Sequence, residues 1–355
     1  MCIRGDFMNI KYKPDFEILE AALCGEKPER IPLAEMTVDK GKKAEYLGRA
    51  VRTPADEVAF WKSSGHDFVP FNIDLGDMNP KGIKPGEGER TDKEGVLADG
   101  RAWASEGTGV ITSLEQLEGH PFPSPDDIAS EEFSGLISEL EPGMKIVLTT
   151  GHIFTDTWRL MGFDTFAMAL LENFDFVQAV TDRIGCIILE SSERLIENPA
   201  VGALKVADDI AYTEGLMVAP EILERLLFPW IKKIADLCRS RNVPFIYHSD
   251  GDLSLVFDRL IELGMDAYNP IEPKAMDIRK LKEKYGSKVC LIGNVDLGYT
   301  LTRGTPGEVK REVNGLLEDV GRKGAYALSS ANSIPHYVPI ENFRAMIEAA
   351  VTWER

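Results

Sequence analysis

Residues 243–250 read VPFIYHSD, an apolar run that ends in a histidine, a serine and an aspartate. Short runs rich in β-branched and aromatic residues are typical of buried strands, and the polar residues that follow mark the end of the strand. The pattern recurs along the chain, so we predict eight strands in all, over residues 30–35, 67–74, 145–151, 202–209, 243–250, 265–270, 288–296 and 324–332.

Helical patterns separate most of these runs. Residues 219–241 begin with Ala-Pro-Glu, which places a proline and an acid in a first helical turn, and apolar residues follow at helical spacing. Residues 253–263, 278–285 and 306–321 have similar spacing. Eight strands that alternate with helices fit a closed barrel better than an open sheet. We therefore predict an α/β fold, a single (β/α)8 TIM barrel that forms one domain over residues 1–355.

The connection between the second and third predicted strands, residues 75–144, is too long for a simple βα unit. It is rich in Gly, Pro, Asp and Glu and contains an extended piece at 101–114. We predict that this long insertion is an excursion over the barrel mouth, with at least one helix near 125–140. No GxGxxG or GxxxxGK[ST] motif follows a predicted strand, which argues against a dinucleotide or nucleoside-triphosphate site.

The composition limits the classes of partner. A formal net charge of −18 disfavours binding to nucleic acid or to an anionic membrane surface. The five cysteines are scattered and odd in number, which favours reduced thiols over a disulfide framework. No apolar run is long enough to span a membrane, and residues 1–12 lack the apolar core of a signal peptide. We expect a cytoplasmic protein that binds a small molecule.

Polar side chains follow nearly every predicted strand, and active sites of barrels lie at the carboxyl ends of their strands. Asp, Asn and Ser also cap helices and form turns, so each one taken alone is more often structural. The collective pattern favours an active site. Its candidate residues are Glu35, Asn72, Asp74, His152, Asp208, Asp209, His248, Asp250, Glu272 and Asn332.

His248 follows an apolar run, so its ring should lie at the barrel mouth. Asp250 stands two residues on, and the pair Asp208-Asp209 ends the preceding strand. A histidine beside carboxylates can bind a divalent metal or act as an acid–base pair, and spacing alone does not separate these uses. Trp158 lies in an aromatic-rich helical stretch that mainly faces the core, yet it is close enough to the mouth to line a substrate pocket.

Four segments resemble the uroporphyrinogen decarboxylase superfamily: ADD at 207–209, YHSDG at 247–251, GNVD at 293–296 and VPIEN at 338–342. The resemblance runs from about residue 30 to the C-terminus and is strongest after residue 202. It implies a (β/α)8 barrel, in agreement with the strand count. The superfamily includes the haem-pathway decarboxylase and cobalamin-dependent methyltransferases that act on methanol, methylamine or aryl methyl ethers.

The chain departs from the decarboxylases of that superfamily. Their N-terminal Arg-Gln-Ala-Gly-Arg segment, which supplies arginines for substrate carboxylates, is replaced by LAEM at 33–36. A tetrapyrrole with many carboxylates needs several such cations. The catalytic aspartate of the decarboxylases matches Asn72 or Asp74 only loosely, and their late histidine is replaced by Asn332.

The chain also departs from the thiol-forming methyltransferases, which bind zinc through a His-x-Cys on strand five and a later cysteine on strand eight. The matching positions are His248, Asp250 and residues 329–332, which contain no thiolate. Zinc that activates a thiol prefers soft sulfur ligands. An oxygen-rich site is better suited to polarising an ether or alcohol oxygen, with the metal as a Lewis acid.

The resemblance therefore implies a methyltransferase that moves a methyl group between a small ether, alcohol or amine substrate and a corrinoid supplied by a corrinoid-binding partner protein. A divalent metal such as zinc is the cofactor that this chemistry would use. The predicted catalytic residues are His248, Asp250, Asp208 and Asp74, the predicted substrate-binding residues are Glu35, Asn72, His152, Asp209, Trp158 and Asn332, and the predicted metal ligands are His248, Asp250 and Glu272.

Two alternatives stay open at this point. One is a decarboxylase of uroporphyrinogen or a related acid, in which Asp74 or Asp208 stabilises a protonated intermediate. The other is a binding protein that has kept the barrel and lost the chemistry. The oligomeric state is also open, with a homodimer as one option.

Overall fold

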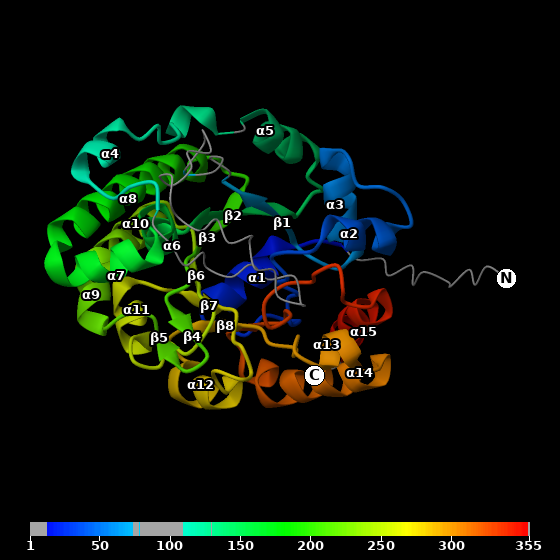
Figure 1. The fold of residues 1–355 in the computed structure, drawn as a ribbon. Coiled ribbons are helices and arrows are strands. Elements are labelled where there is room, and N and C mark those ends of the chain that lie inside the picture. The colour runs from blue at the N-terminus through cyan, green and yellow to red at the C-terminus, as the bar shows by residue number, and fades with distance from the viewer. Residues whose placement is uncertain (1–12, 74–77, 79–108, 129, 354–355) are drawn as a thin grey trace.

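The computed structural model describes residues 13–73, 78, 109–128 and 130–353. The described residues form a curled sheet of seven parallel strands with helices around its outer face (Figure 1). The order across the sheet follows the chain, as expected for successive βαβ units. The strands are β1 (Phe68–Asn72), β2 (Lys145–Gly151), β3 (Val201–Ala207), β6 (Phe245–His248), β7 (Ala267–Asn269), β8 (Cys290–Ile292) and β9 (Tyr326–Ala327).

The predicted strand over 30–35 is present only as a single bridge position. Leu33 pairs in parallel with His66, just before β1, and with Leu328, just after β9. The Ala34 N–H donates to the Leu328 carbonyl at 2.8 Å, and the Leu328 N–H donates to the Pro32 carbonyl at 2.9 Å. This segment therefore lies between the two edge strands. Pro32 has no N–H to donate, which limits the ladder here.

The helices agree largely with the predicted ranges. α12 spans the predicted residues 278–285, and α14 begins at Pro306 behind a capping box formed by Thr305 and Glu308. The single helix predicted over 219–241 is two helices, α9 and α10, that meet at Leu227. Pro229 lies in the first turn of α10 and lacks the N–H that a continuous helix would use there.

The full set of helices is α1 (Phe16–Leu23), α2 (Lys40–Leu47), α3 (Pro54–Ser63), α4 (Leu114–Gly119), α5 (Ser130–Glu139), α6 (Ile153–Met161), α7 (Phe163–Glu172), α8 (Phe174–Ile196), α9 (Pro220–Leu226), α10 (Phe228–Ser240), α11 (Phe257–Leu263), α12 (Ile278–Tyr285), α13 (Thr300–Arg303), α14 (Pro306–Asp319) and α15 (Ile340–Val351). Two 3-10 turns, η1 (Pro125–Asp127) and η2 (Gly321–Lys323), and a short antiparallel pair, β4 (Ala211–Tyr212) and β5 (Gly215–Leu216), complete the described elements.

Residues 75–77, 79–108 and 129 of the predicted excursion over 75–144 lie outside the described residues, and its path over the mouth stays a prediction. Its described part contains α4, η1 and α5, of which η1 and α5 occupy the region where a helix was expected near 125–140. Among the helices of the described chain, none combines the length and the apolar character needed to cross a membrane.

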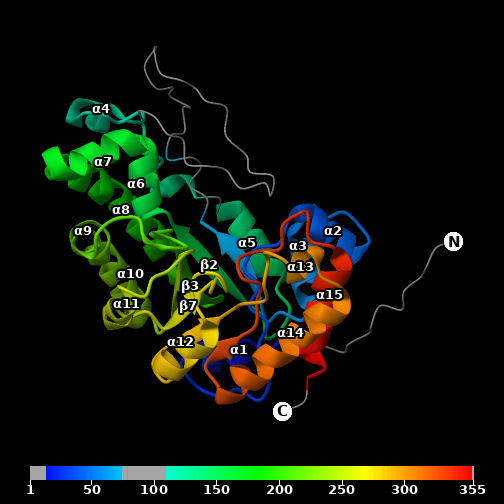
Figure 2. The same ribbon diagram turned by 60° about the horizontal axis from the view of Figure 1, so that its bottom comes forward.

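The interior of the curled sheet is apolar at one end, where α1 lies against it. Figure 1 shows α1 in the middle of the ring of strands, and Figure 2 shows it below them. Gly202 at the start of β3 permits this approach, because a Cβ there would lie 2.4 Å from ring atoms of Phe16. We call this group the apolar inner layer; its members are Phe16, Leu19, Ala22, Leu23, Ala34, Met36, Phe68, Val147, Ala203, Ile246, Ala267, Cys290, Ile292 and Ala327.

Alternate residues of the same strands face the surrounding helices and belong to a separate, larger core. On β3, Leu204 and Val206 belong to this outer core, whereas Ala203 belongs to the apolar inner layer. The same alternation on β6 separates Tyr247 from Ile246. Because side chains alternate between the two faces of a strand, this division shows which residues point into the sheet's interior.

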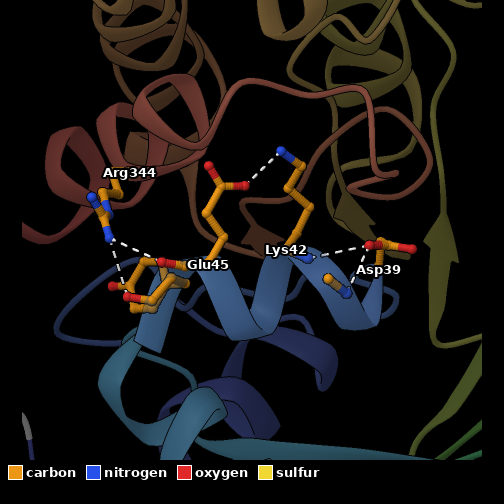
Figure 3. A network of polar contacts seen from close by, with 6 residues as sticks. Asp39, Lys42, Glu45 and Arg344 are labelled. Carbon is orange, nitrogen blue, oxygen red and sulfur yellow. Dashed lines mark hydrogen bonds and ion pairs between the residues drawn. The ribbon is translucent and has the colours of Figure 1, made fainter. Parts of the chain in front are cut away.

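The last helix, α15, contacts α2, one of the first helices of the chain. Arg344 of α15 donates to the carbonyls of Glu45 and Tyr46 at the carboxyl end of α2, and Asp39 caps the amino end of α2 (Figure 3). The Tyr46 ring lies edge-on to Phe343 of α15, with 5.9 Å between centroids. A cation suits the carboxyl end of a helix because the last carbonyls there lack partners.

Candidate active site

The inner face of the sheet becomes polar towards the carboxyl ends of the strands. On β6, His248 stands two residues beyond Ile246 on the same face, and on β3 Lys205 stands two residues beyond Ala203. Thr149 likewise stands two residues beyond Val147 on β2, and Asn269 stands two residues beyond Ala267 on β7. On β1, Asn72 stands four residues beyond Phe68. We call this set the polar inner layer: Asn72, Thr149, Lys205, His248 and Asn269.

Three residues at this end of the sheet form a cluster with metal-ligand chemistry. One ligand atom from each of Asp209, His248 and Asp250 lies within 4.8 Å of the others, and all three residues are partly buried. The Asp250 backbone N–H donates to Asp209 Oδ1 at 2.9 Å, which ties the ends of β3 and β6 together. One imidazole and two carboxylates form a donor set that suits zinc or a similar divalent cation.

The environment of His248 favours a neutral ring that can act as a ligand. Its Nδ1 lies 2.7 Å from Asn269 Oδ1, an oxygen that can only accept, so Nδ1 carries the proton. Burial, followed by the positive charge of Lys205, lowers the pKa of His248 to about 4. At neutral pH, Nε2 therefore keeps its lone pair, and Asn269 fixes the ring in the manner of an outer-shell partner.

Asp250 and Asn332 come together although the sequence places them on distant strands. The Asn332 side-chain amide lies 2.9 Å from Asp250 Oδ1 and 2.8 Å from Asp250 Oδ2. Asn332 itself is placed by the Ser330 hydroxyl, which accepts from its backbone N–H at 3.4 Å. The predicted substrate-binding residue Asn332 thus orients the carboxylate of a predicted catalytic residue.

Glu272 lies next to this cluster but outside its three members. Its Oε2 accepts a hydrogen bond from the Gly251 backbone N–H at 3.0 Å. Gly251 has φ of +87°, and a Cβ there would lie 2.6 Å from the backbone of Ala211, so only glycine fits this turn. Glu272 therefore holds the loop that carries Asp250, and its predicted part as a metal ligand stays a prediction.

Asp208 uses its side chain to position α6. Oδ2 accepts from the Phe154 N–H at 2.7 Å, and Oδ1 accepts from the N–H and the hydroxyl of Thr155, both at 2.9 Å. Burial raises the pKa of Asp208 to about 7, against the effect of these hydrogen bonds. A carboxylate that fills both oxygens with helix N-terminal donors stabilises the start of α6.

Glu35 is a buried carboxyl group with one oxygen engaged. Oε2 accepts from the Ser330 N–H at 2.9 Å, whereas Oε1 is buried with no hydrogen-bond partner in the structure. Burial raises the pKa of Glu35 to about 7. His66 supports the segment, because its Nε2 accepts from the Glu35 backbone N–H at 3.3 Å and its Nδ1 lies 2.9 Å from the Ser64 hydroxyl.

The other predicted site residues are placed less centrally. His152 is exposed and stands in a left-handed conformation at the start of α6, with φ of 72°. Trp158 is buried in the outer core, and its Nε1 has no hydrogen-bond partner in the structure. Asn72 ends β1 and is exposed. Asp74, a predicted catalytic residue, lies outside the described residues.

Sequence reasoning missed Lys205, Asn269 and His66 as members of the site. A signal for Lys205 was available, because a lysine inside the apolar run GALKVA must either reach solvent or face a polar interior. Asn269 lies at the end of the predicted strand 265–270, but its partner across the sheet follows only from the register that pairs it with His248.

Comparison with known proteins places the chain in a family. A sequence model of the family described as Uroporphyrinogen decarboxylase (URO-D) matches residues 113–353, about two thirds of the chain. A uroporphyrinogen decarboxylase from Actinobacillus succinogenes is 28% identical over 33% of this chain and 33% of its own length. The methylcobamide:CoM methyltransferase MtaA of Methanosarcina barkeri is 23% identical over 41% of this chain and 40% of its own length. The chain thus matches less than half the length of each of these curated relatives.

A solved structure supports the same assignment at the level of the fold. A methyltransferase from Methanosarcina mazei superposes with a TM-score of 0.70 at 18% identity, covering 96% of this chain and 99% of the other. At that identity the likeness shows the fold alone. The family match, the fold and the resemblance of the strand-end segments agree, and the chain belongs to the uroporphyrinogen decarboxylase family.

Proposed function

We propose that this protein is a methyltransferase that moves a methyl group between a small ether, alcohol or amine and a corrinoid held by a partner protein. The observation that carries the proposal is the cluster of Asp209, His248 and Asp250, in which the ring of His248 is oriented by Asn269 and kept neutral by burial and by the charge of Lys205. The proposal takes the fold to be a closed (β/α)8 barrel, which the bridges of Leu33 to both edge strands support.

The cluster fits a divalent metal such as zinc, which His248, Asp209 and Asp250 would hold and which would supply Lewis-acid polarisation of the substrate heteroatom. When the bond between the methyl carbon and the heteroatom breaks, its electron pair stays on the heteroatom, which then takes a proton. The chain's own contribution is a preset donor geometry: Asn269 orients His248, Asn332 orients Asp250, and the Asp250 N–H orients Asp209.

The donor set also bears on the substrate class. Aspartate occupies the position of the cysteine that thiol-forming relatives use, and oxygen donors leave a metal harder and more electrophilic than thiolates do. Such a site supports the activation of an ether or alcohol oxygen. The proposed direction of transfer is therefore from a methylated oxygen or nitrogen to cobalt.

The test combines metal analysis with a methyl-transfer assay. Full-length protein purified without chelators is analysed for bound metal, and methylation of free cob(I)alamin is followed by its visible spectrum with a panel of methyl ethers, methanol and methylamines. We expect close to one equivalent of divalent metal and transfer from at least one donor. His248→Ala should lose both, whereas His336→Ala, a change at an exposed histidine outside the cluster, should keep both.

Two results would contradict the proposal. If the purified protein kept no metal and His248→Ala transferred methyl groups as well as the unmodified chain, the metal-assisted chemistry would be wrong. Conversion of uroporphyrinogen III to coproporphyrinogen, beside an active control decarboxylase, would replace the proposal with the decarboxylase alternative. The relatives described as uroporphyrinogen decarboxylases make that assay a necessary comparison.

A further inference from the structure

Three polar side chains lie side by side on the inner face of β1, β2 and β3, neighbouring strands in Figure 1. Asn72 is in register with Thr149, and Thr149 is in register with Lys205. Each shares the inner face with an apolar residue of its own strand: Phe68, Val147 and Ala203 respectively. An amide, a hydroxyl and an ammonium group therefore form one row across the interior, which we call the Lys205 row.

The row contains polar atoms that the protein leaves without partners. The Thr149 hydroxyl is buried and makes no hydrogen bond in the structure. Lys205 is only 3% exposed, and its Nζ makes no hydrogen bond or close ion pair with another residue of the described chain, although Glu35 and Asp209 lie within electrostatic reach. A buried ammonium group is costly unless an anion or several acceptors face it. Lys282 shows the contrast, since its buried Nζ donates to the carbonyls of Gly286, Gly324 and Ala325.

We propose that the Lys205 row binds the carboxylate of the substrate, which makes the substrate a small organic acid that carries its methyl group at the far end. The methyl group at the reacting end of the substrate rests on the proposed function. The carboxylate at the other end rests on the Lys205 row alone. Lys205 supplies the charge, and the Thr149 hydroxyl and the Asn72 amide supply neutral donors from the neighbouring strands.

The charges around the row favour a monoanion over a phosphate. Lys205 is the one cation in the row, and the carboxylates of Asp209 and Glu35 lie within electrostatic reach of it. A dianion would be repelled by these acids and would find no second cation within the row. A carboxylate needs one ammonium group and two or three neutral donors, which is what the row offers.

The position of the row limits the length of the substrate. Lys205 is in register with Ile246, and Ala207 is in register with His248. The row therefore lies two residues before His248 along the strand direction, on the same inner face. Two residues of a strand span roughly 6–7 Å. A carboxylate on Lys205 and a heteroatom near His248 would therefore be separated by about that distance, as across a substituted benzene ring.

The test uses 4-methoxybenzoate as the probe and 4-methoxybenzamide as its neutral match. Binding to the full-length, chelator-treated protein is measured by calorimetry, so neither metal nor corrinoid is needed. We expect the acid to bind about tenfold more tightly than the amide, as for one charge-assisted contact. Lys205→Met should remove this preference without changing the amide's affinity, and Thr149→Val should weaken the acid about threefold.

Lys145→Met is the matched control, because Lys145 lies at the opposite end of β2, with its Nζ 5.6 Å from the Phe16 ring centroid. It should leave both affinities unchanged. The inference is overturned if the acid and the amide bind equally, if the acid does not bind at millimolar concentration, or if inorganic phosphate competes as well as the acid. If Lys205→Met does not fold, Thr149→Val and Thr149→Ser decide, with loss of affinity expected only for the valine. Failure of methyl transfer with this binding intact would count against the proposed function alone.

Discussion

The two inner layers of the sheet lie on the same strands, yet they follow different physical rules. In the apolar inner layer, Val147 and Ala203 are fully buried, and α1 packs against this end of the interior. Two residues further along the same strands, Thr149 and Lys205 belong to the polar inner layer, where the Thr149 hydroxyl lies buried without a partner. Each such group costs about 1–3 kcal/mol in a folded protein. The apolar inner layer stabilises the fold. The polar inner layer costs stability, as is expected of a site that binds a ligand.

The largest expected effect concerns Glu35, whose buried Oε1 has no partner in the structure. Its pKa is raised by burial to about 7 from an ordinary 4.5, so the folded chain holds this proton more tightly than the unfolded chain. The stabilising contribution of Glu35 is complete below pH 4.5 and is lost as the pH rises to 7. Glu35→Gln cannot ionise, and we expect it to be more stable than the unmodified chain by on the order of 2–3 kcal/mol at pH 8.

The measurement is urea unfolding with chelator present at several pH values, and the advantage of Glu35→Gln should grow between pH 4.5 and 7 and then level off. Glu308→Gln provides a control of opposite sign, because hydrogen bonds from Thr305 lower the pKa of the exposed Glu308. A constant difference between Glu35→Gln and the unmodified chain across this range would show that Glu35 is not a strained, buried acid.

Two opposite substitutions on β2 compare the energetics of the two layers more directly. Val147 and Thr149 share the inner face, and valine and threonine have nearly the same shape. Val147→Thr places an unpaired hydroxyl in the apolar inner layer and should cost about 2 kcal/mol. Thr149→Val removes a buried hydroxyl that has no partner and should raise the free energy of unfolding by about 1–2 kcal/mol. Equal costs in urea unfolding would mean that the two layers are not physically distinct.

The fold was largely predictable from the sequence because each strand is a short apolar run with a polar end. That signal located β6 and its His248-Ser249-Asp250 end, and the capping pattern placed the start of α14. The edge at Leu33 was less predictable, since a segment that contributes a single bridge has the same apolar run as a full strand. The break at Leu227 depended on how Pro229 is accommodated, which the apolar spacing of 219–241 conceals.

The sequence predicted where the site lies, but not which of its side chains contact one another. Alternation along one strand indicates that His248 and Asp250 share a face, but only the register between strands brings Asn269 to His248. The contact between Asn332 and Asp250 likewise joins residues 82 positions apart. Lys205 was overlooked because its neighbours in sequence are apolar, whereas its neighbours in space are Thr149 and the acids near the mouth.

The smallest expected effect concerns Asn269, which links the polar inner layer to the proposed metal site. Asn269 is 2% exposed, and its Oδ1 accepts a hydrogen bond from His248 Nδ1 at 2.7 Å. Asn269→Leu removes the acceptor and keeps the volume, so the ring should lose its fixed orientation, and zinc affinity should fall about tenfold. Asn269→Asp keeps an acceptor oxygen in the same place and should retain most of the affinity. Competition with a chromophoric zinc chelator measures both variants, with circular dichroism to confirm that each is folded. If both lost affinity equally, the hydrogen bond to His248 would not be what prepares the ring, and the polar inner layer would serve packing at this position as the apolar inner layer does below it.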